Sequence, residues 1–273
     1  MTDLSDAFAN KYINPLVQLY KSAYLEILKE QQNITVAKVV RNRAVLRQIE
    51  GIVKELDNET YNWLKKNLPD LYKKGMKVAV DGLKEANLDV KYSSFTQIHE
   101  KAVEYVVSTT YVDYARALEM VIKDSKRIVD ETLKSNIQVE LAKGAIKGNT
   151  REEVTKNVVK LIKDTGAVAL KDKGSKTWQL DTYAEMLTRT KTIAAHNEGV
   201  KNRMIENGYD LCIVSDHFGS CPLCSPWEGK IYSLTGATKG YTMLSKAIEN
   251  GLFHPNCRHT YYPYHTQLSF LDK

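Results

Sequence analysis

The chain has 273 residues, of which 43% are hydrophobic and 26% are charged. These proportions are typical of a globular protein, and the length allows one large domain or two smaller ones. No apolar run approaches the roughly 18 residues that a membrane span needs, so no membrane span is expected. The net charge of +6 is spread along the chain. It permits contact with nucleic acid but does not indicate sequence-specific readout.

Proline and glycine are scarce in the first two thirds of the chain. No proline occurs between Pro69 and Pro222, and no glycine occurs at residues 83–143. Long segments without either residue are mostly helical. Apolar residues recur with the helical period, which predicts helices at residues 14–28, 39–56 and 61–76. We expect Asn14-Pro15 to begin the first helix and Pro69 to kink or divide the third.

A further helical segment is predicted after a polar break at residues 87–91. Ser93 or Ser94 can cap it, because a serine hydroxyl accepts a hydrogen bond from a free backbone N–H of the first turn. Its apolar face continues as far as Leu141. This length corresponds to one bent helix of about 45 residues, or to two helices in tandem, where an average helix has about 12.

Beyond residue 145 the pattern changes. Gly148-Asn149-Thr150 is predicted to end one helix and to begin another with a capping box, and the charged turn at residues 171–176 suggests a hairpin that ends at Trp178. A helix is expected from Asp181 to Gly208. Three strands are then predicted, at residues 209–215, in 227–232 after a turn, and at 258–264.

The expected fold class is therefore α+β and mostly α. A helical body, residues 1–144, would come first. A smaller α+β domain, residues 145–273, would follow it and would contain a β module at about residues 209–265.

Two short motifs near the C-terminus suggest a metal site. Cys221-Pro-Leu-Cys224 and His254-Pro-Asn-Cys257 each place two ligand residues three positions apart. Three cysteines and one histidine are the ligands of a tetrahedral structural zinc site, and four protein ligands leave no position for a substrate. We therefore predict a structural Zn²⁺ bound by these four residues.

Three other interpretations of the motifs remain open. A disulfide is disfavoured because the chain shows no signal peptide and is expected to fold in a reducing cytoplasm. A thioredoxin-like redox site would need a helix after the first cysteine, whereas Ser225-Pro226-Trp227 suggests a turn. A Cys–His nucleophile is the third, but no thiol is singled out as reactive.

Several polar residues lie close to the motifs in the sequence or are expected to lie close to them in the fold. Asp216, His217 and His259 could contact the metal ligands or lie at the surface, and one of them could replace a ligand and open the site. Arg189 could be a surface ion pair with Glu185, or could tie its helix to the sheet through carbonyls or Asp216. Cys212 lies in an apolar run and is expected in the core.

The C-terminal half closely resembles phage minor capsid proteins, a branch of the portal-associated minor head proteins with a MuF-type head-morphogenesis domain. The resemblance covers residues 140–265, while residues 1–140 are similar only in being helical. Three stretches carry it: Lys171–Thr190, Val214–Ser233 with Asp-His-Phe-Gly and Pro-Trp-Glu-Gly, and His254–Tyr264 with His-Pro-Asn-Cys-Arg-His.

The resemblance implies a non-enzymatic structural protein of a tailed bacteriophage. Such a protein would lie near the portal inside the head of the virion, and in the host cytoplasm during assembly. It would assist head morphogenesis or DNA ejection. Its expected partners are the portal protein, the major capsid or scaffolding protein, and DNA bound without sequence preference. The resemblance implies that residues 1–144 contact the portal or capsid and that residues 145–273 are the MuF-like domain with the zinc-binding β module. The alternative is a zinc-dependent nuclease or hydrolase that uses His217, Glu228 or His259 around an open zinc.

Overall fold

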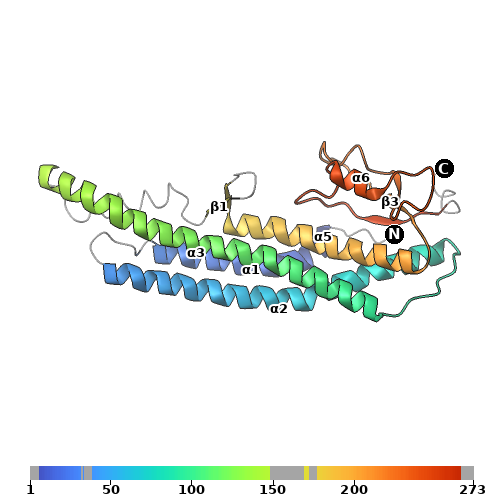
Figure 1. Ribbon diagram of the computed structural model, residues 1–273, viewed down its shortest axis with the longest axis horizontal. Coiled ribbons are helices and arrows are strands. Elements are labelled where there is room, and N and C mark those ends of the chain that lie inside the picture. The colour runs from blue at the N-terminus through green and yellow to red at the C-terminus, as the bar shows by residue number, and fades with distance from the viewer. Residues whose placement is uncertain (1–5, 32, 34–38, 148–168, 172–176, 266–273) are drawn as a thin grey trace. The chain divides into compact units, whose positions relative to one another are not determined.

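The computed structural model describes residues 6–31, 33, 39–147, 169–171 and 177–265 (Figure 1). The helices are α1 (Asp6–Gln31), α2 (Val39–Glu85), α3 (Gln97–Lys147), α5 (Leu180–Glu206) and α6 (Leu244–Glu249). The strands are β1 (Ala169–Lys171), β2 (Thr177–Gln179), β3 (Leu211–Val214), β4 (Ile231–Ser233) and β5 (Tyr261–Pro263). The predicted α+β, mostly α fold is confirmed. No helix among these residues combines the length and apolar character of a membrane span.

The long helices pass through residues that were expected to break them. α1 begins nine residues before Pro15, and α2 continues through both the expected break at residues 57–60 and Pro69. An internal proline removes one backbone hydrogen bond and costs about 3 kcal/mol. Burial of neighbours offsets this cost, because Tyr12, Ile13 and Leu68 are at most 6% exposed. Packing therefore overrides the local signal for a break.

The other helix boundaries follow the predictions more closely. α3 is one helix of 51 residues, which agrees with the first of the two predicted alternatives. α5 ends at Glu206, two residues before Gly208, whose φ of 81° is the left-handed conformation that commonly terminates a helix. The predicted capping box at Thr150 and the turn at residues 172–176 lie outside the described residues.

Contacts divide the chain into two compact units, each built from segments that are distant in sequence. Unit 1 comprises Met1–Asn14, Trp63–Thr110 and Glu185–Lys273. Unit 2 comprises Pro15–Asn62 and Tyr111–Ala184. The boundary between residues 144 and 145 stays a prediction.

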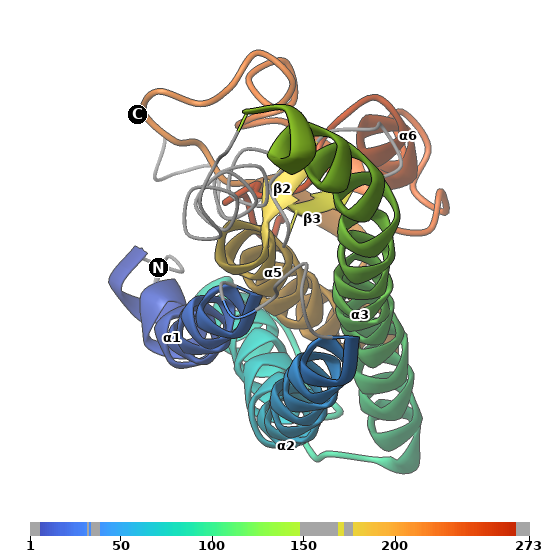
Figure 2. The same cartoon turned by 90° about the vertical axis from the view of Figure 1, so that its left-hand side faces the viewer.

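Unit 2 contains parts of α1, α2 and α3, which pack together (Figure 2). Tyr20 lies at the centre of this packing and is fully buried. Its hydroxyl is 3.1 Å from Thr60 Oγ1 of α2, and its ring centroid is 5.7 Å from that of Tyr114 on α3. Tyr20 and Tyr114 thus belong to an internal core, whereas Tyr61 of α2 and Tyr105 of α3 are exposed. Unit 2 also contains the predicted hairpin, in which β1 pairs antiparallel with β2 and Leu170 lies opposite Trp178.

In unit 1, α2 and α5 cross at two glycines. A Cβ atom on Gly75 would lie 1.9 Å from the carbonyl oxygen of His196, and one on Gly199 would lie 2.0 Å from that of Tyr72. The two backbones therefore touch directly, which only glycine allows. This crossing fixes the part of α5 that supports the C-terminal sheet.

The C-terminal sheet has the strand order β4-β3-β5, and both pairs of neighbours are antiparallel. The three strands overlap the three that were predicted. α6 was not predicted; it is only six residues long and offers too little periodicity to be recognised. One hydrophobic core joins the sheet, α2, α5, α6 and the cysteine-bearing turns. It contains Ala79, Val200, Met204, Cys212, Val214, Cys224, Tyr232, Leu244, Ala247, Leu252, Cys257 and Tyr261.

Candidate metal site

Two turns of similar geometry carry the predicted ligands. Cys221 and Cys224 lie between β3 and β4, and His254 and Cys257 lie between α6 and β5. In each turn the last residue donates its backbone N–H to the carbonyl oxygen of the first, at 3.0 Å. Asn256 has a φ of 68°, a left-handed conformation that asparagine adopts more readily than most residues. The local sequence thus folds each ligand pair into a tight turn.

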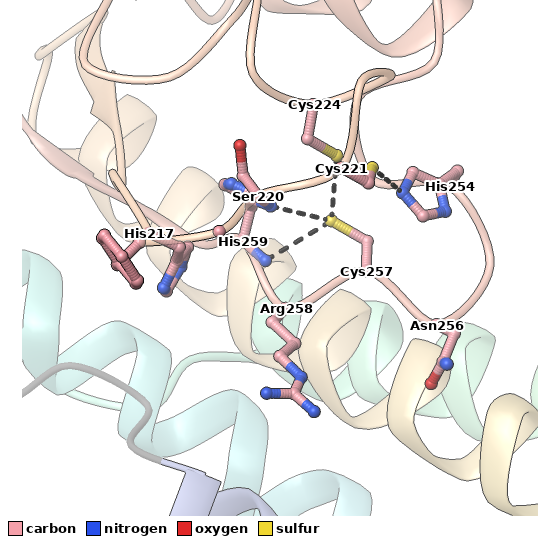
Figure 3. A pocket seen from close by; sticks show the side chains of 11 residues that line it. His217, Ser220, Cys221, Cys224, His254, Asn256, Cys257, Arg258 and His259 are labelled. Atoms are coloured by element: carbon pink, nitrogen blue, oxygen red, sulfur yellow. Dashed lines mark hydrogen bonds between the residues drawn. The ribbon is translucent and has the colours of Figure 1, made fainter.

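The two turns face each other, so the predicted ligand atoms gather in one place (Figure 3). Cys221 Sγ is 3.0 Å from His254 Nε2, and Cys224 Sγ is 3.6 Å from Cys257 Sγ. Cys257 Sγ is 3.2 Å from His259 Nδ1. All four predicted ligands are brought together, and a fifth donor joins them.

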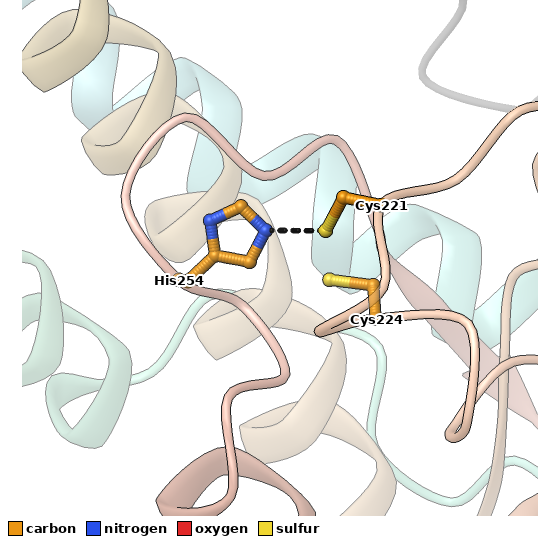
Figure 4. A group of neighbouring side chains, drawn as sticks. All are labelled: Cys221, Cys224 and His254. Atoms are coloured by element: carbon orange, nitrogen blue, oxygen red, sulfur yellow. Dashed lines mark hydrogen bonds between the residues drawn. The ribbon is translucent and has the colours of Figure 1, made fainter.

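These five donors form two overlapping groups of three. Cys221, Cys224 and His254 make one group (Figure 4), and Cys224, Cys257 and His259 make the other. Within each group every pair of ligand atoms is at most 4.8 Å apart. Cys224 belongs to both. The cluster could bind a metal such as zinc, because thiolate sulfur and imidazole nitrogen are the donors that zinc prefers.

Burial, hydrogen bonds and neighbouring sulfur atoms shift the pKa values of the three thiols in different directions. Burial raises the pKa of Cys221, but hydrogen bonds from backbone N–H groups and from His254 outweigh it and lower this pKa to about 7. Burial also raises the pKa of Cys257, but hydrogen bonds with His259 outweigh burial and lower this pKa. Burial and the neighbouring Cys257 sulfur raise the pKa of Cys224. The pKa values of two of the three thiols are therefore lowered, and that of the third is raised.

Glu228 connects the two turns. Its carboxylate accepts a short hydrogen bond from His259 Nε2, another from Ser220 Oγ at 2.7 Å, and a third from the backbone N–H of His217 at 3.2 Å. Burial raises the pKa of Glu228, but these hydrogen bonds outweigh burial and lower it. Ser220 directly precedes Cys221, so a single carboxylate holds both ligand-bearing segments.

The other polar residues near the motifs have separate positions. Asp216 is exposed. His217 Nε2 is 2.9 Å from Ser215 Oγ. The ring of His217 meets the ring of His259 edge to face, with 4.6 Å between the ring centroids. Cys212 is fully buried in β3, as expected for a core residue.

Arg189 ties α5 to the second turn. Its guanidinium donates one hydrogen bond to Asn256 Oδ1 at 2.6 Å and another to Glu185 at 3.1 Å, rather than contacting Asp216. The backbone N–H of Asn256 also donates to Thr190 Oγ1 at 2.9 Å. The arginine therefore makes both the ion pair and a link across the fold, but the link reaches the turn instead of the sheet. Its role in supporting the metal ligands stays a prediction.

A cavity of about 500 Å³ adjoins the thiols. His217, Phe218, Ser220, Asn256 and Arg258 are among its lining residues, together with the five metal donors. The donors are thus reachable by an ion from solvent.

Comparison with protein families identifies the chain. The family described as phage minor capsid protein 2 matches residues 9–270. The chain belongs to this family. The match extends over the helical body as well as the C-terminal sheet, whereas the resemblance in the sequence was specific only from about residue 140. Neither curated proteins nor solved structures gave a match.

Membership of the phage minor capsid protein 2 family places the protein among structural components of the phage capsid, and hence of the virion. This is consistent with the expectation of a non-enzymatic protein.

Proposed function

We propose that the protein is a minor component of a tailed-phage head that lies inside the capsid near the portal and assists head morphogenesis, DNA ejection or both. The observation that carries this proposal is the family match over residues 9–270. The long helices offer extended surfaces for the portal protein and for the major capsid or scaffolding protein. The net charge of +6 favours contact with DNA through its phosphates.

An asymmetric electron-microscopy map of the intact particle tests the location. We expect density for α2 and α3 on the inner side of the portal vertex. Cross-linking of purified particles, followed by mass spectrometry, should join lysines of this chain to the portal protein. Cross-links confined to the major capsid protein, far from the portal vertex, would contradict the proposal.

We further propose that Zn²⁺ bound by Cys221, Cys224, His254 and Cys257 stabilises the C-terminal region. The thiols belong to the hydrophobic core of that region, since Cys224 and Cys257 are at most 6% exposed. Zinc binding to structural sites is worth about 10–16 kcal/mol, comparable with the stability of a whole domain, about 5–15 kcal/mol. Zinc would then determine whether residues 209–265 fold.

Chelation tests the role of zinc. Treating the full chain with EDTA should expose backbone amides of β3, β4 and β5 to hydrogen exchange, while amides of α1 and the first half of α2 keep their protection. Adding Zn²⁺ should restore protection. Equal exchange with and without chelator would show that zinc does not stabilise this region.

A zinc-dependent nuclease or hydrolase is the second candidate. The cavity beside the thiols favours it, because His217 and His259 line this cavity with the metal donors and Glu228 is hydrogen-bonded to both histidines. Cleavage of linear DNA by the zinc-loaded chain, abolished by EDTA and by the replacement Glu228→Gln, would support it. DNA that remains intact with zinc-loaded protein would reject the nuclease.

A further inference from the structure

The two groups of donors share one sulfur. Cys221 and His254 lie on one side of Cys224, and Cys257 and His259 lie on the other (Figure 3). A tetrahedral zinc with Zn–S bonds of about 2.3 Å and Zn–N bonds of about 2.0 Å separates its ligand atoms by about 3.5–3.8 Å. The observed separations of 3.0 to 3.6 Å are within about half an ångström of this value.

Both imidazoles are oriented as metal ligands. His254 Nδ1 lies 2.8 Å from the carbonyl oxygen of Pro255, and His259 Nε2 is bonded to the carboxylate of Glu228. A carbonyl oxygen and a carboxylate can only accept hydrogen bonds, so these nitrogens carry the protons. When the rings are neutral, the lone pairs of the other two nitrogens, His254 Nε2 and His259 Nδ1, face Cys221 and Cys257. A carboxylate behind a histidine is the usual arrangement around protein-bound zinc.

We infer that the site binds two zinc ions, with the thiolate of Cys224 as the bridge between them. One ion is held by Cys221, Cys224 and His254, and the other by Cys224, Cys257 and His259. This inference rests on the proposed zinc site and adds His259 as a direct ligand. Binding of the two Zn²⁺ ions releases to solvent the protons of those thiols that are still protonated, and each ion keeps one further position for water.

Charge balance favours two ions over one. Three thiolates and the Glu228 carboxylate carry four negative charges, which two Zn²⁺ neutralise. A single Zn²⁺ would leave an excess of two negative charges in a pocket where Cys224, Cys257 and His259 are at most 6% exposed. Unbalanced charge is costly at a buried position. In a one-ion site, His259 would have to be protonated and donate a hydrogen bond to Cys257. The number of bound ions distinguishes the two arrangements.

Native mass spectrometry of the full chain, reconstituted with Zn²⁺, counts the ions directly. We expect two per chain, and one per chain in both His254→Ala and His259→Ala. One ion in the wild type would overturn the two-ion site and leave the proposed zinc staple intact. No bound ion would overturn both. A second ion that persists in both variants would lie elsewhere and would also overturn the inference.

Matched variants control for indirect effects. His217→Gln changes a histidine of the same cavity that belongs to neither group, and Cys212→Ala removes a buried thiol outside the cluster; both should retain two ions. Glu228→Gln should lower the affinity for the second ion about 10- to 100-fold, as does the loss of a group that hydrogen-bonds to a metal ligand. Glu249→Gln on the exposed face of α6 should leave this affinity unchanged. Equal affinities for both Glu variants would contradict the role of Glu228.

Cobalt gives a second, spectroscopic count of the bound ions. The absorption from thiolate-to-Co²⁺ charge transfer should rise until two equivalents are added to the wild type, and until one equivalent in His259→Ala. Saturation of the wild type at one equivalent would overturn the inference.

Discussion

Replacing Gly199 by alanine is expected to destabilise unit 1, although alanine is the better helix former. A Cβ at this position would lie 2.0 Å from the carbonyl oxygen of Tyr72 and 3.1 Å from the backbone nitrogen of Met76. Carbon atoms in contact are normally about 3.5–4.0 Å from their neighbours, so α2 and α5 would have to separate by about 1 Å or more. Both obstructing atoms are backbone atoms and cannot rotate away.

The magnitude follows from two opposing terms. Alanine in place of glycine favours a helix by about 1 kcal/mol, and overpacking costs about 1–3 kcal/mol or more. A contact with backbone lies at the upper end of that range, so we expect a net loss of about 2 kcal/mol. Gly75→Ala should behave alike, because its Cβ would lie 1.9 Å from His196 O. The double variant should lose less than the sum, since one separation of the helices relieves both clashes.

Urea unfolding, with hydrogen exchange to assign each transition to a unit, measures the effect. Gly51→Ala is the matched control: Gly51 also lies inside a helix, and nothing is within 4 Å of its Cβ position. It should gain about 0.5–1 kcal/mol. A Gly199→Ala variant that is stabilised as much as Gly51→Ala would refute the close crossing of α2 and α5.

Three further outcomes are expected. Cys224→Ala should abolish zinc binding in elemental analysis and remove exchange protection from residues 209–265 while α1 retains it; full zinc content in this variant would contradict the site. Asp210 has a lowered pKa because hydrogen bonds from Ser233, Thr235 and Thr238 outweigh its burial. Its contribution to stability is therefore complete above the unfolded pKa of about 3.9 and is lost as the pH falls below it. The deficit of Asp210→Asn in urea unfolding should accordingly shrink between about pH 6 and pH 3, and a constant deficit would argue against this role. Arg189→Met should destabilise the C-terminal region by about 1 kcal/mol in the same assay, because it removes the hydrogen bond to Asn256. An unchanged midpoint of urea unfolding would show that this hydrogen bond does not contribute to stability.

The helical character of the chain and the gathering of the ligands could be predicted from sequence because both depend on local pattern. Apolar periodicity identifies helices regardless of their partners, and the spacing of Cys221, Cys224, His254 and Cys257 fixes two tight turns. That the two turns meet was inferred from the ligand types that a metal prefers. The structure brings them together through β3, which was recognisable as an apolar run, and β5, which was predicted within residues 258–264.

Other features depend on contacts that no local pattern encodes. The start of α1 was predicted wrongly because burial of Tyr12 and Ile13 outweighs the signal at Pro15. The break predicted at residues 57–60 of α2 was also wrong, and Thr60 within it is fully buried. The role of Glu228 as a link between the turns was missed: it lies in a Trp-Glu-Gly turn, and only the fold brings it to His259. The importance of Gly75 and Gly199 also depends on a partner helix far away in sequence.

The interleaved segments of the two units impose an order on folding during synthesis. All of unit 2 has been made once Ala184 is added, whereas unit 1 needs residues up to the C-terminal sheet. Gly75 meets its partner helix only after the chain has grown to Gly199, and at about 5–20 residues per second this takes roughly 6–25 s. Throughout that time the segment of α2 from Trp63 lacks the surface that will cover it. The apolar face of this helix in the nascent phage protein therefore lacks the cover that α5 and the C-terminal sheet supply until the last third of the chain emerges from the ribosome.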